Sequence, residues 1–233
     1  MHAGRSRVMA ENTVRKIAPF IETDIFAAES WLSDMAAKGL FFKEGAFWWK
    51  LIFEKGEPAK RRYRLVPAEH MELYTITTGE MSVYESAGWH YAGVYQECSS
   101  RVFYTEDENA EEIYTDSKGL EFFYKRQRIK VLLPSVLMIA LLIFDVYLFC
   151  FKGDRPAVLE GINGADAIYI LAGTVLTAIY AAASAVNVIS LKKKLKSGQI
   201  SHGVKYSGRL AFGKAVKIAI MVYTLLLILI SIR

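Results

Sequence analysis

The feature that most constrains the fold is a series of three long apolar runs in the C-terminal half of the chain. They extend over about Val131 to Phe151, Ala167 to Leu191 and Ala215 to Ile232. Because an α-helix rises about 1.5 Å per residue, each run is long enough to cross a hydrocarbon core of about 30 Å. A single run is also compatible with a buried helix of a soluble protein, but three in succession with basic flanks favour transmembrane helices.

The charge of the chain is divided in a way that fits this interpretation. Residues 1–124 carry 14 Lys and Arg against 20 Asp and Glu, whereas residues 125–233 carry 15 against 4. Positive charge therefore accompanies the apolar runs, which is typical of membrane flanks rather than of a DNA-binding surface. Basic residues concentrate before the first run and between the second and third runs. The positive-inside rule thus predicts a multi-pass protein with a cytoplasmic N-terminal half and its C-terminus outside.

Residues 13–107 contain a weak internal repeat and are expected to form a cytoplasmic α+β domain. The segments AAKGLFF and ESAGWHY mark the same point of each copy, where a helix ends at a glycine and an aromatic strand follows. Asp24 is in place to cap the first helix and Gly39 to end it in the left-handed conformation, and the second helix is expected at about Ile76 to Ala87. The pattern predicts a duplicated β-α-β-β unit, with a largely antiparallel six-stranded sheet and two helices on one face.

The other boundaries follow from changes in composition. Residues 1–12 are expected to form a flexible N-terminus. Residues 108–128 begin acidic and polar and then become aromatic and basic, which predicts a connector followed by a juxtamembrane helix. Residues 129–233 are expected to form a transmembrane domain of three helices.

The stretch AFWWKLIF, residues 46–53, is apolar at nearly every position, and a basic strand, RRYRLVP, follows at residues 61–67. We expect the two strands to pair as a hairpin with Glu54 opposite Lys60, because a slip of one residue would place Leu51 among basic side chains. The core face of this hairpin would carry Phe47, Trp49, Leu51, Phe53, Tyr63 and Leu65.

The opposite face of the hairpin is basic and is a candidate site for an anionic ligand or an acidic partner. Arginine side chains suit carboxylates and phosphates, and an aromatic residue beside them supplies an apolar anchor. A solvated sheet face and a contact with anionic inner-leaflet lipid are the alternatives. The residues of this face are Trp48, Lys50, Ile52, Arg62 and Arg64.

Polar residues inside the apolar runs form a second set of candidates. Asp145 lies within the first run, where a carboxylate is costly in lipid and where such residues are often functional. Either Thr174 and Thr177 of the second run or Tyr223 and Thr224 of the third are expected to reach its depth. Lys217 of the third run lies toward the inner side and is expected to snorkel inward. A protonated or hydrogen-bonded packing residue is the alternative for Asp145.

A stripe of small residues recurs every four positions on the second run, at Gly173, Thr177, Ala181 and Ala185. Small residues on one helix face allow two helix backbones to approach closely. The stripe therefore predicts either packing among the three runs or dimerisation of the chain.

The sequence carries no motif of catalysis or cofactor binding. The segment EKGEPAK lacks the spacing of a phosphate-binding loop, and neither a Ser-His-Asp order nor a Cys/His metal spacing occurs. We therefore expect no enzymatic activity, no cofactor, no metal site and no direct binding of nucleic acid.

The segments WLSDMAAKG, FEKGEP, AGWHYAGVY and VFYTEDENAEEIYTD, followed by apolar spans, resemble the bacterial family called domain of unknown function 2812. The likeness covers about Thr13 to Arg128. The family has no established activity, so the resemblance supplies no catalytic residues. Its members are often encoded near PadR-type transcriptional repressors in Gram-positive bacteria, which implies a regulatory partner and a location in the bacterial cytoplasmic membrane.

The doubled β-α-β-β pattern also resembles the effector-binding modules of the GyrI type, which hold small ligands. These resemblances imply a membrane-anchored cytoplasmic sensor or interaction module that binds a transcriptional regulator or a small ligand, with a homodimer as one arrangement. A small transporter or channel accessory subunit that uses Asp145 is the second hypothesis. An enzyme acting on lipid is the third.

Overall fold

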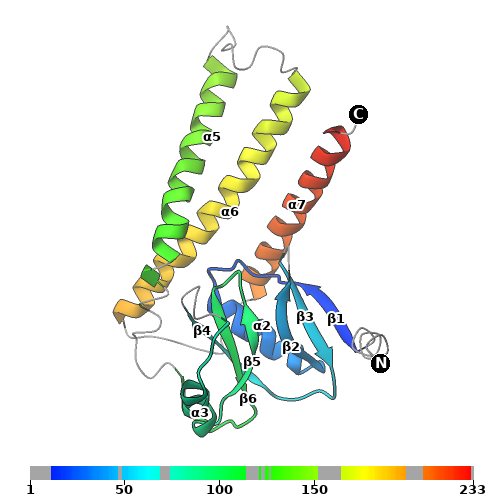
Figure 1. Ribbon diagram of the computed structural model, residues 1–233. Coiled ribbons are helices and arrows are strands. Elements are labelled where there is room, and N and C mark those ends of the chain that lie inside the picture. Colours follow the sequence, from blue (N-terminus) through cyan, green and yellow to red (C-terminus); the bar gives the residue numbers. More distant parts are fainter. Residues whose placement is uncertain are drawn as a thin grey trace.

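The computed structural model of the chain describes residues 12–46, 49–68, 74–113, 121, 124–125, 127–151, 164–197 and 207–231. The expected flexible N-terminus lies outside these residues except for Asn12, as do residues 114–120 of the expected connector. A mixed α+β unit precedes long C-terminal helices (Figure 1). The elements of this unit are β1 (Thr13–Ile17), α2 (Ile25–Ala36), β2 (Leu40–Ala46), β3 (Lys50–Lys55), β4 (Arg62–Pro67), α3 (Thr78–Ser86), β5 (His90–Tyr95) and β6 (Ser100–Thr105).

The α+β unit follows the expected β-α-β-β order twice, but its strands form two sheets. One sheet has the order β1-β3-β2 and the other β4-β6-β5, with antiparallel pairing throughout. The prediction of one six-stranded sheet is therefore wrong. The sheets meet at β2 and β5, where each strand has an irregularity in its register, after Phe42 and after Tyr91. Such bulges interrupt the ladder of hydrogen bonds, which explains why the two sheets abut without joining.

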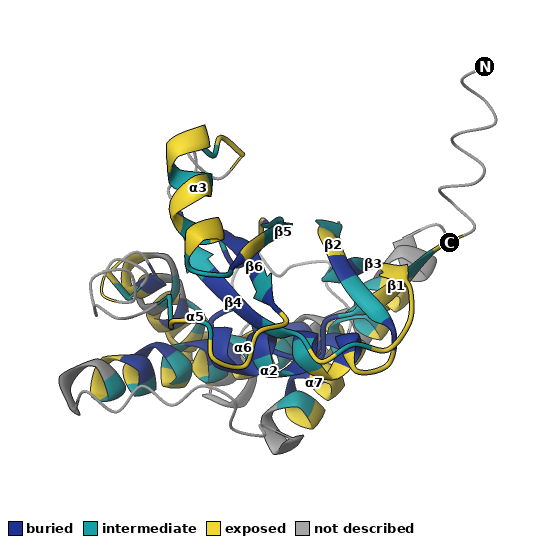
Figure 2. Ribbon diagram, turned by 90° about the horizontal axis from the view of Figure 1, so that it is seen from below, coloured by how far each residue is buried: buried dark blue, intermediate teal, exposed yellow. Residues whose placement is uncertain are grey.

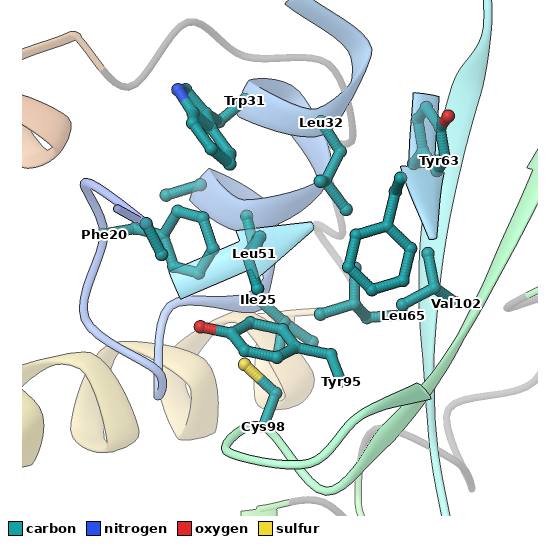
Figure 3. Close-up of a cluster of buried hydrophobic side chains, with 14 of the residues drawn as sticks. Phe20, Ile25, Trp31, Leu32, Leu51, Tyr63, Leu65, Tyr95, Cys98 and Val102 are labelled. Carbon is teal, nitrogen blue, oxygen red and sulfur yellow. The ribbon is translucent and has the colours of Figure 1, made fainter. Parts of the chain in front are cut away.

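The predicted hairpin of residues 46–53 with residues 61–67 is also wrong. Strand β3 lies between β1 and β2, so both of its edges are already occupied, and β4 pairs with β6 in the other sheet. Four of the six expected inward-facing residues nevertheless lie fully buried in one core (Figure 3): Leu51, Phe53, Tyr63 and Leu65. Trp49 is only partly buried and lies outside this core, and Phe47 lies outside the described residues.

Helix α2 packs on the inner faces of both sheets and begins and ends as expected. The Ala27 amide donates a hydrogen bond to Asp24 Oδ1 at 3.2 Å, which caps the helix, and Gly39 follows the helix with a φ of 73°. Trp31 packs edge-on against Phe53, with the ring centroids 5.5 Å apart. The helix thus joins the two sheets into one hydrophobic core.

Helix α2 also covers the free edge of β4. The amide of Leu65 donates to Glu29 Oε1 at 3.0 Å, and the amide of Tyr63 donates to Ser33 Oγ at 3.4 Å. These side chains satisfy backbone groups that an uncovered edge strand would offer to another chain.

Helix α3 lies on the other face of the second sheet, so the prediction of two helices on one face is wrong (Figure 2). Neighbouring residues of a strand point to opposite faces. On β6, Val102 belongs to the core under α2, whereas the ring of Phe103 lies 4.3 Å from that of Tyr84 on α3. Arg101 points the same way as Phe103 and pairs with Glu80 of α3. The outer face of β6 therefore offers α3 both an aromatic and a charged partner.

Helical elements follow the α+β unit: a short π-helix, η1 (Arg128–Leu132), and then α5 (Leu133–Phe151), α6 (Gly164–Ser197) and α7 (Ser207–Ser231). The three long helices occupy the positions of the three expected spans. Among the residues described, one stretch, Leu171–Lys194 of α6, is long and apolar enough to cross a membrane. Several side chains of α5 and the last ones of α7 lie outside the described set.

Helices α5 and α6 lie side by side and extend away from the α+β unit (Figure 1). Large apolar side chains of α5 are exposed along its length, which is unfavourable in water. They are Leu133, Val136, Leu137, Ile139, Leu141, Ile143, Phe144 and Tyr147.

Candidate functional site

The α+β unit meets the long helices through the loop between β1 and α2, residues 18–24. Most of this loop is buried, although a loop would ordinarily lie on the surface. Its close approach to α7 depends on Gly213. A Cβ on this residue would lie 2.5 Å from the carbonyl oxygen of Pro19 and 3.1 Å from Cα of Phe20.

Glu22 in this loop connects the two helices α6 and α7. Its carboxylate forms an ion pair with Lys217 of α7 and accepts a hydrogen bond from the hydroxyl of Tyr180 of α6. Lys217 also donates to the carbonyl oxygen of Ala18 at 3.2 Å. We call these three side chains, Glu22, Tyr180 and Lys217, the Glu22 cluster.

The lysine of the Glu22 cluster is fully buried. Lysine is almost never buried unless its charge is paired, so Glu22 is essential to this arrangement. Aromatic rings complete the surroundings, since the centroids of Phe20 and Trp49 lie 5.5 and 5.3 Å from Lys217 Nζ. Both rings are within the range of a cation–π interaction. The cluster therefore holds the loop, α6 and α7 in one position.

The C-terminal half of α6 continues this contact. Asn187 donates to Thr23 Oγ1 at 3.4 Å, and Thr23 in turn donates to the carbonyl oxygen of Ser184 at 3.5 Å. Leu191 belongs to the hydrophobic core of the α+β unit, and Lys194 Nζ lies 4.4 Å from the ring centroid of Phe26. Part of α6 is thus a component of the folded unit rather than a separate anchor.

Cys98 lies next to Tyr95 in the core (Figure 3) and contacts the loop through a hydrogen bond. It is a fully buried free thiol whose Sγ donates to the carbonyl oxygen of Glu22 at 3.2 Å. Burial raises the pKa of the Cys98 thiol well above its ordinary value. Because the thiolate is the reactive form, this shift lowers the reactivity of Cys98, and its hydrogen bond makes it a packing residue of the loop.

A cavity of about 550 Å³ opens beside the Glu22 cluster, between the α+β unit and α7. This volume is in the range of small-molecule sites. Trp49 lines the cavity with a φ of 58°, a left-handed conformation that is rare for a bulky residue. Its carbonyl oxygen accepts a hydrogen bond of 2.8 Å from the Ala18 amide, which ties the cavity wall to the buried loop. The lining residues are Gly45, Ala46, Trp49, Gln96, Glu97, Ile220, Met221 and Thr224.

Glu97 gives the cavity its acidic group. Its Oε2 is buried and has no hydrogen-bond partner in the described part of the chain. A Cβ on Gly45 would lie 3.2 Å from this oxygen, so the glycine leaves room for the carboxyl group. Burial, together with the negative charge of Glu22, raises the pKa of Glu97, and a hydrogen bond from its own backbone amide and the positive charge of Lys217 oppose this shift.

The structure does not bring the residues of the expected basic face together. Lys50 and Ile52 lie on β3, in the first sheet, whereas Arg62 and Arg64 lie on β4, in the second. Trp48 lies outside the described residues. A role of these five residues in binding a ligand or partner stays a prediction.

The two arginines of this set contact groups of the chain itself. Arg64 is buried, with its Nε and Nη2 at 2.6 and 2.8 Å from the two carboxylate oxygens of Glu112 and its Nη1 at 3.8 Å from Glu29. Arg62 donates to the carbonyl oxygens of Asp107 and Ala110 at 2.9 and 3.0 Å. Both arginines thereby attach residues 107–112 to the second sheet.

Of the expected intramembrane polar residues, Thr174, Thr177 and Lys217 are not among the described residues that line the cavity. The side chain of Asp145 on α5 is outside the described set. Thr177 donates to the carbonyl oxygens of Gly173 and Thr174 in its own helix, at 2.9 and 3.0 Å. Lys217, in contrast, belongs to the Glu22 cluster rather than projecting to an interface.

The stripe of small residues on α6 contacts its neighbouring helices at two points. A Cβ on Gly173 would overlap the side chain of Tyr223 on α7. The carbonyl oxygen of Ala181 accepts a hydrogen bond of 3.1 Å from Ser135 on α5. Thr177 is exposed and Ala185 is partly buried.

Sequence reasoning did not single out Glu22, Tyr180 or Glu97. Two features were present for Glu22 and its partner: an acidic residue directly after the apolar segment APFI, and a lysine, Lys217, inside an apolar run. Each is costly to bury alone, and together they are the expected members of a buried pair.

A family model described as "Protein of unknown function (DUF2812)" matches residues 24–136, from the end of the buried loop to the start of α5. This match confirms the resemblance noted in the sequence. No curated protein and no solved structure matches the chain. Among the residues that the structure describes, no group of His, Cys, Asp and Glu side chains is arranged to hold a metal ion.

Proposed function

Residues 24–136 of this chain belong to the DUF2812 family of proteins of unknown function, and on that premise we propose that the chain is a membrane-anchored cytoplasmic sensor or interaction module. The observation that carries this proposal is the position of Glu22. A side chain of the α+β unit contacts Tyr180 of α6 and Lys217 of α7 at once. A shift between these helices must therefore break a contact of the α+β unit.

Membrane anchoring is supported by the exposed apolar side chains of α5 and by the apolar stretch Leu171–Lys194 of α6. The residues of α6 before Tyr180 extend beyond the α+β unit, whereas those from Tyr180 to Lys194 contact it. In the proposed arrangement α5, α6 and α7 each cross the bacterial cytoplasmic membrane. The inner end of α6 carries Lys192, Lys193 and Lys194 and lies beside the α+β unit, which agrees with a cytoplasmic location of that unit. The C-terminus is then outside.

Few contacts separate helices α6 and α7 from the first sheet. Lys217 and Tyr180 hold Glu22, and the same loop hydrogen-bonds to Trp49 at the start of β3, the central strand of the first sheet. A buried interface of this kind changes between discrete packings rather than deforming gradually. In this role the chain passes a signal between its helices and a cytoplasmic transcriptional regulator or small ligand, without catalysis and either alone or as a homodimer.

The proposal is tested in the source bacterium by comparing the wild type, a deletion strain, Glu22→Gln and Glu57→Gln. Glu57 is an exposed loop residue, so Glu57→Gln removes the same charge without touching the helices. We expect Glu22→Gln to change the same transcripts as the deletion, at equal protein level, and Glu57→Gln to change none. Identical transcript profiles in all four strains would contradict a regulatory role.

Coupling is measured separately by hydrogen exchange of the full chain in lipid nanodiscs. We expect Glu22→Gln to increase exchange in residues 18–24 and also in β3, because the loop and Trp49 share a hydrogen bond. Increased exchange in the loop alone would mean that the sheet does not respond to the helices.

A further inference from the structure

The cavity beside the Glu22 cluster is built from segments that are far apart in the sequence. The end of β2 contributes Gly45 and Ala46, the turn between β5 and β6 contributes Gln96 and Glu97, and α7 contributes a wall of its own. A molecule bound there would touch the α+β unit and α7 at the same time. Its binding energy would depend on how these two parts are positioned.

The charge of the lining points to the sign of the ligand. Glu97 is acidic, and no basic side chain lines the cavity among the described residues. The nearby Lys217 is already engaged by Glu22 and by the carbonyl oxygen of Ala18. A buried carboxylate oxygen without a donor is costly, so the site favours a ligand that supplies N–H groups and positive charge. An anion would meet the carboxylate without any compensating cation.

The remaining walls point to the body of the ligand. Trp49, Ile220 and Met221 present aromatic, aliphatic and thioether surface. Such walls favour an apolar group, and Met adapts to groups of different shape. A small hydrophilic cation would leave this surface in contact with water.

We propose that the cavity binds an amphiphilic amine, with its ammonium group on Glu97 and its apolar body against Trp49, Ile220 and Met221. This inference rests on the proposed function, because it names the ligand class that a sensor of this architecture would detect. The bound amine stabilises the packing of the α+β unit on α7, since residues of both form the walls.

The test uses titration calorimetry of the full chain in mild detergent at neutral pH with three probes of one shape. These are phenylbutylamine, phenylbutanol and phenylbutyrate, which are cationic, neutral and anionic. We expect the amine to bind most tightly and the carboxylate to bind least. Glu97→Gln should weaken amine binding about tenfold, the loss of one charge-assisted hydrogen bond, and leave the alcohol unchanged. Glu57→Gln is the matched control and should bind like the wild type.

Two results would overturn the proposal. One is equal affinity for the amine, the alcohol and the carboxylate. The other is a Glu97→Gln variant that binds the amine as tightly as Glu57→Gln does. Ala46→Trp supplies an independent check, because its side chain fills the cavity from the β2 wall and should abolish amine binding while Glu97 is retained.

The source of the ammonium group is separated by competition. Vesicles of phosphatidylethanolamine should lower the apparent affinity for the amine probe if a lipid headgroup occupies the site, whereas vesicles of phosphatidylcholine, whose headgroup has no N–H, should not. No competition by either lipid assigns the site to a free amine. The two proposals are measured by separate readouts. Unchanged transcripts in Glu22→Gln would contradict the regulatory role, whereas equal affinity of the wild type for the three probes would contradict the amine site, and either result can occur without the other.

Discussion

Lys217 of α7 and Glu22 of the β1–α2 loop form an ion pair between residues 195 positions apart in the sequence. The pair links a helix of the C-terminal half to the folded N-terminal half, and the lysine has no exposure to solvent. A change that breaks this pair is therefore expected to affect both the stability of the folded protein and the position of α7.

Replacing Lys217 with Met leaves Glu22 without its cation at a mostly buried site. We expect the free energy of unfolding to fall by about 3 kcal/mol, the cost of breaking a buried pair from one side. Denaturant unfolding of the full chain in mild detergent measures this change. Lys214→Met, on the exposed side of the same helix, should shift stability by less than about 0.5 kcal/mol. Equal effects of the two variants would contradict a role of the ion pair.

Replacing Gly213 with Ala places a methyl group against the backbone of Pro19 and Phe20. We expect a loss of about 2 kcal/mol from overpacking and faster hydrogen exchange in residues 18–24. Gly79→Ala is the matched control, because a Cβ there meets open space in the exposed helix α3. It should stabilise the protein by about 0.5–1 kcal/mol through helix propensity. A Gly213→Ala variant that also gains stability would show that the loop is not held against α7.

Replacing Arg64 with Met removes a buried guanidinium group that contacts Glu112 and Glu29. The carboxylate of Glu29 is itself buried, so we expect a loss of about 3 kcal/mol in unfolding free energy. Arg15→Met, on the exposed side of β1, should be nearly neutral. If Arg64 served only to bind a ligand, the Arg64→Met variant would instead be as stable as Arg15→Met.

Glu97 makes stability depend on pH. Its pKa is raised in the folded protein, chiefly by burial, so the folded state binds its proton more tightly than the unfolded chain does. The stabilisation is complete below the ordinary pKa of 4.5 and is lost as pH rises through the raised value. The stability of the wild type relative to Glu97→Gln should therefore fall between acidic and neutral pH, as measured by thermal unfolding at each pH. A difference that stays constant or grows with pH would contradict the shift.

Local chemistry predicted much of the α+β unit correctly. Asp24 as a helix cap and Gly39 in the left-handed region depend on a few neighbouring residues, and both are present as expected. The alternation of apolar residues within a strand is equally local, so the burial of Leu51 and Tyr63 was predicted although their pairing was not. The choice of β1 and β2 as partners of β3 depends on distant strands and could not be predicted in this way.

The candidate site was beyond sequence reasoning for the same reason. Arg64 looked like an accessible cation, and only the fold brings Glu112, 48 residues away, to its guanidinium group. Likewise, Glu97 lies in a turn, and only the packing of the α+β unit beside α7 makes it a wall of the cavity with one buried carboxyl oxygen lacking a donor in the described part of the chain.

By itself, the sequence determined the helices, the inner faces of the strands and the apolar runs, because these depend on residues a few positions apart. The tertiary structure alone decided that the strands form two sheets, that Glu22 meets Lys217 and that a cavity lined by Glu97 remains between the α+β unit and α7. A buried charge destabilises the fold unless an opposite charge pairs with it, and the residues that form such pairs here are far apart in the sequence.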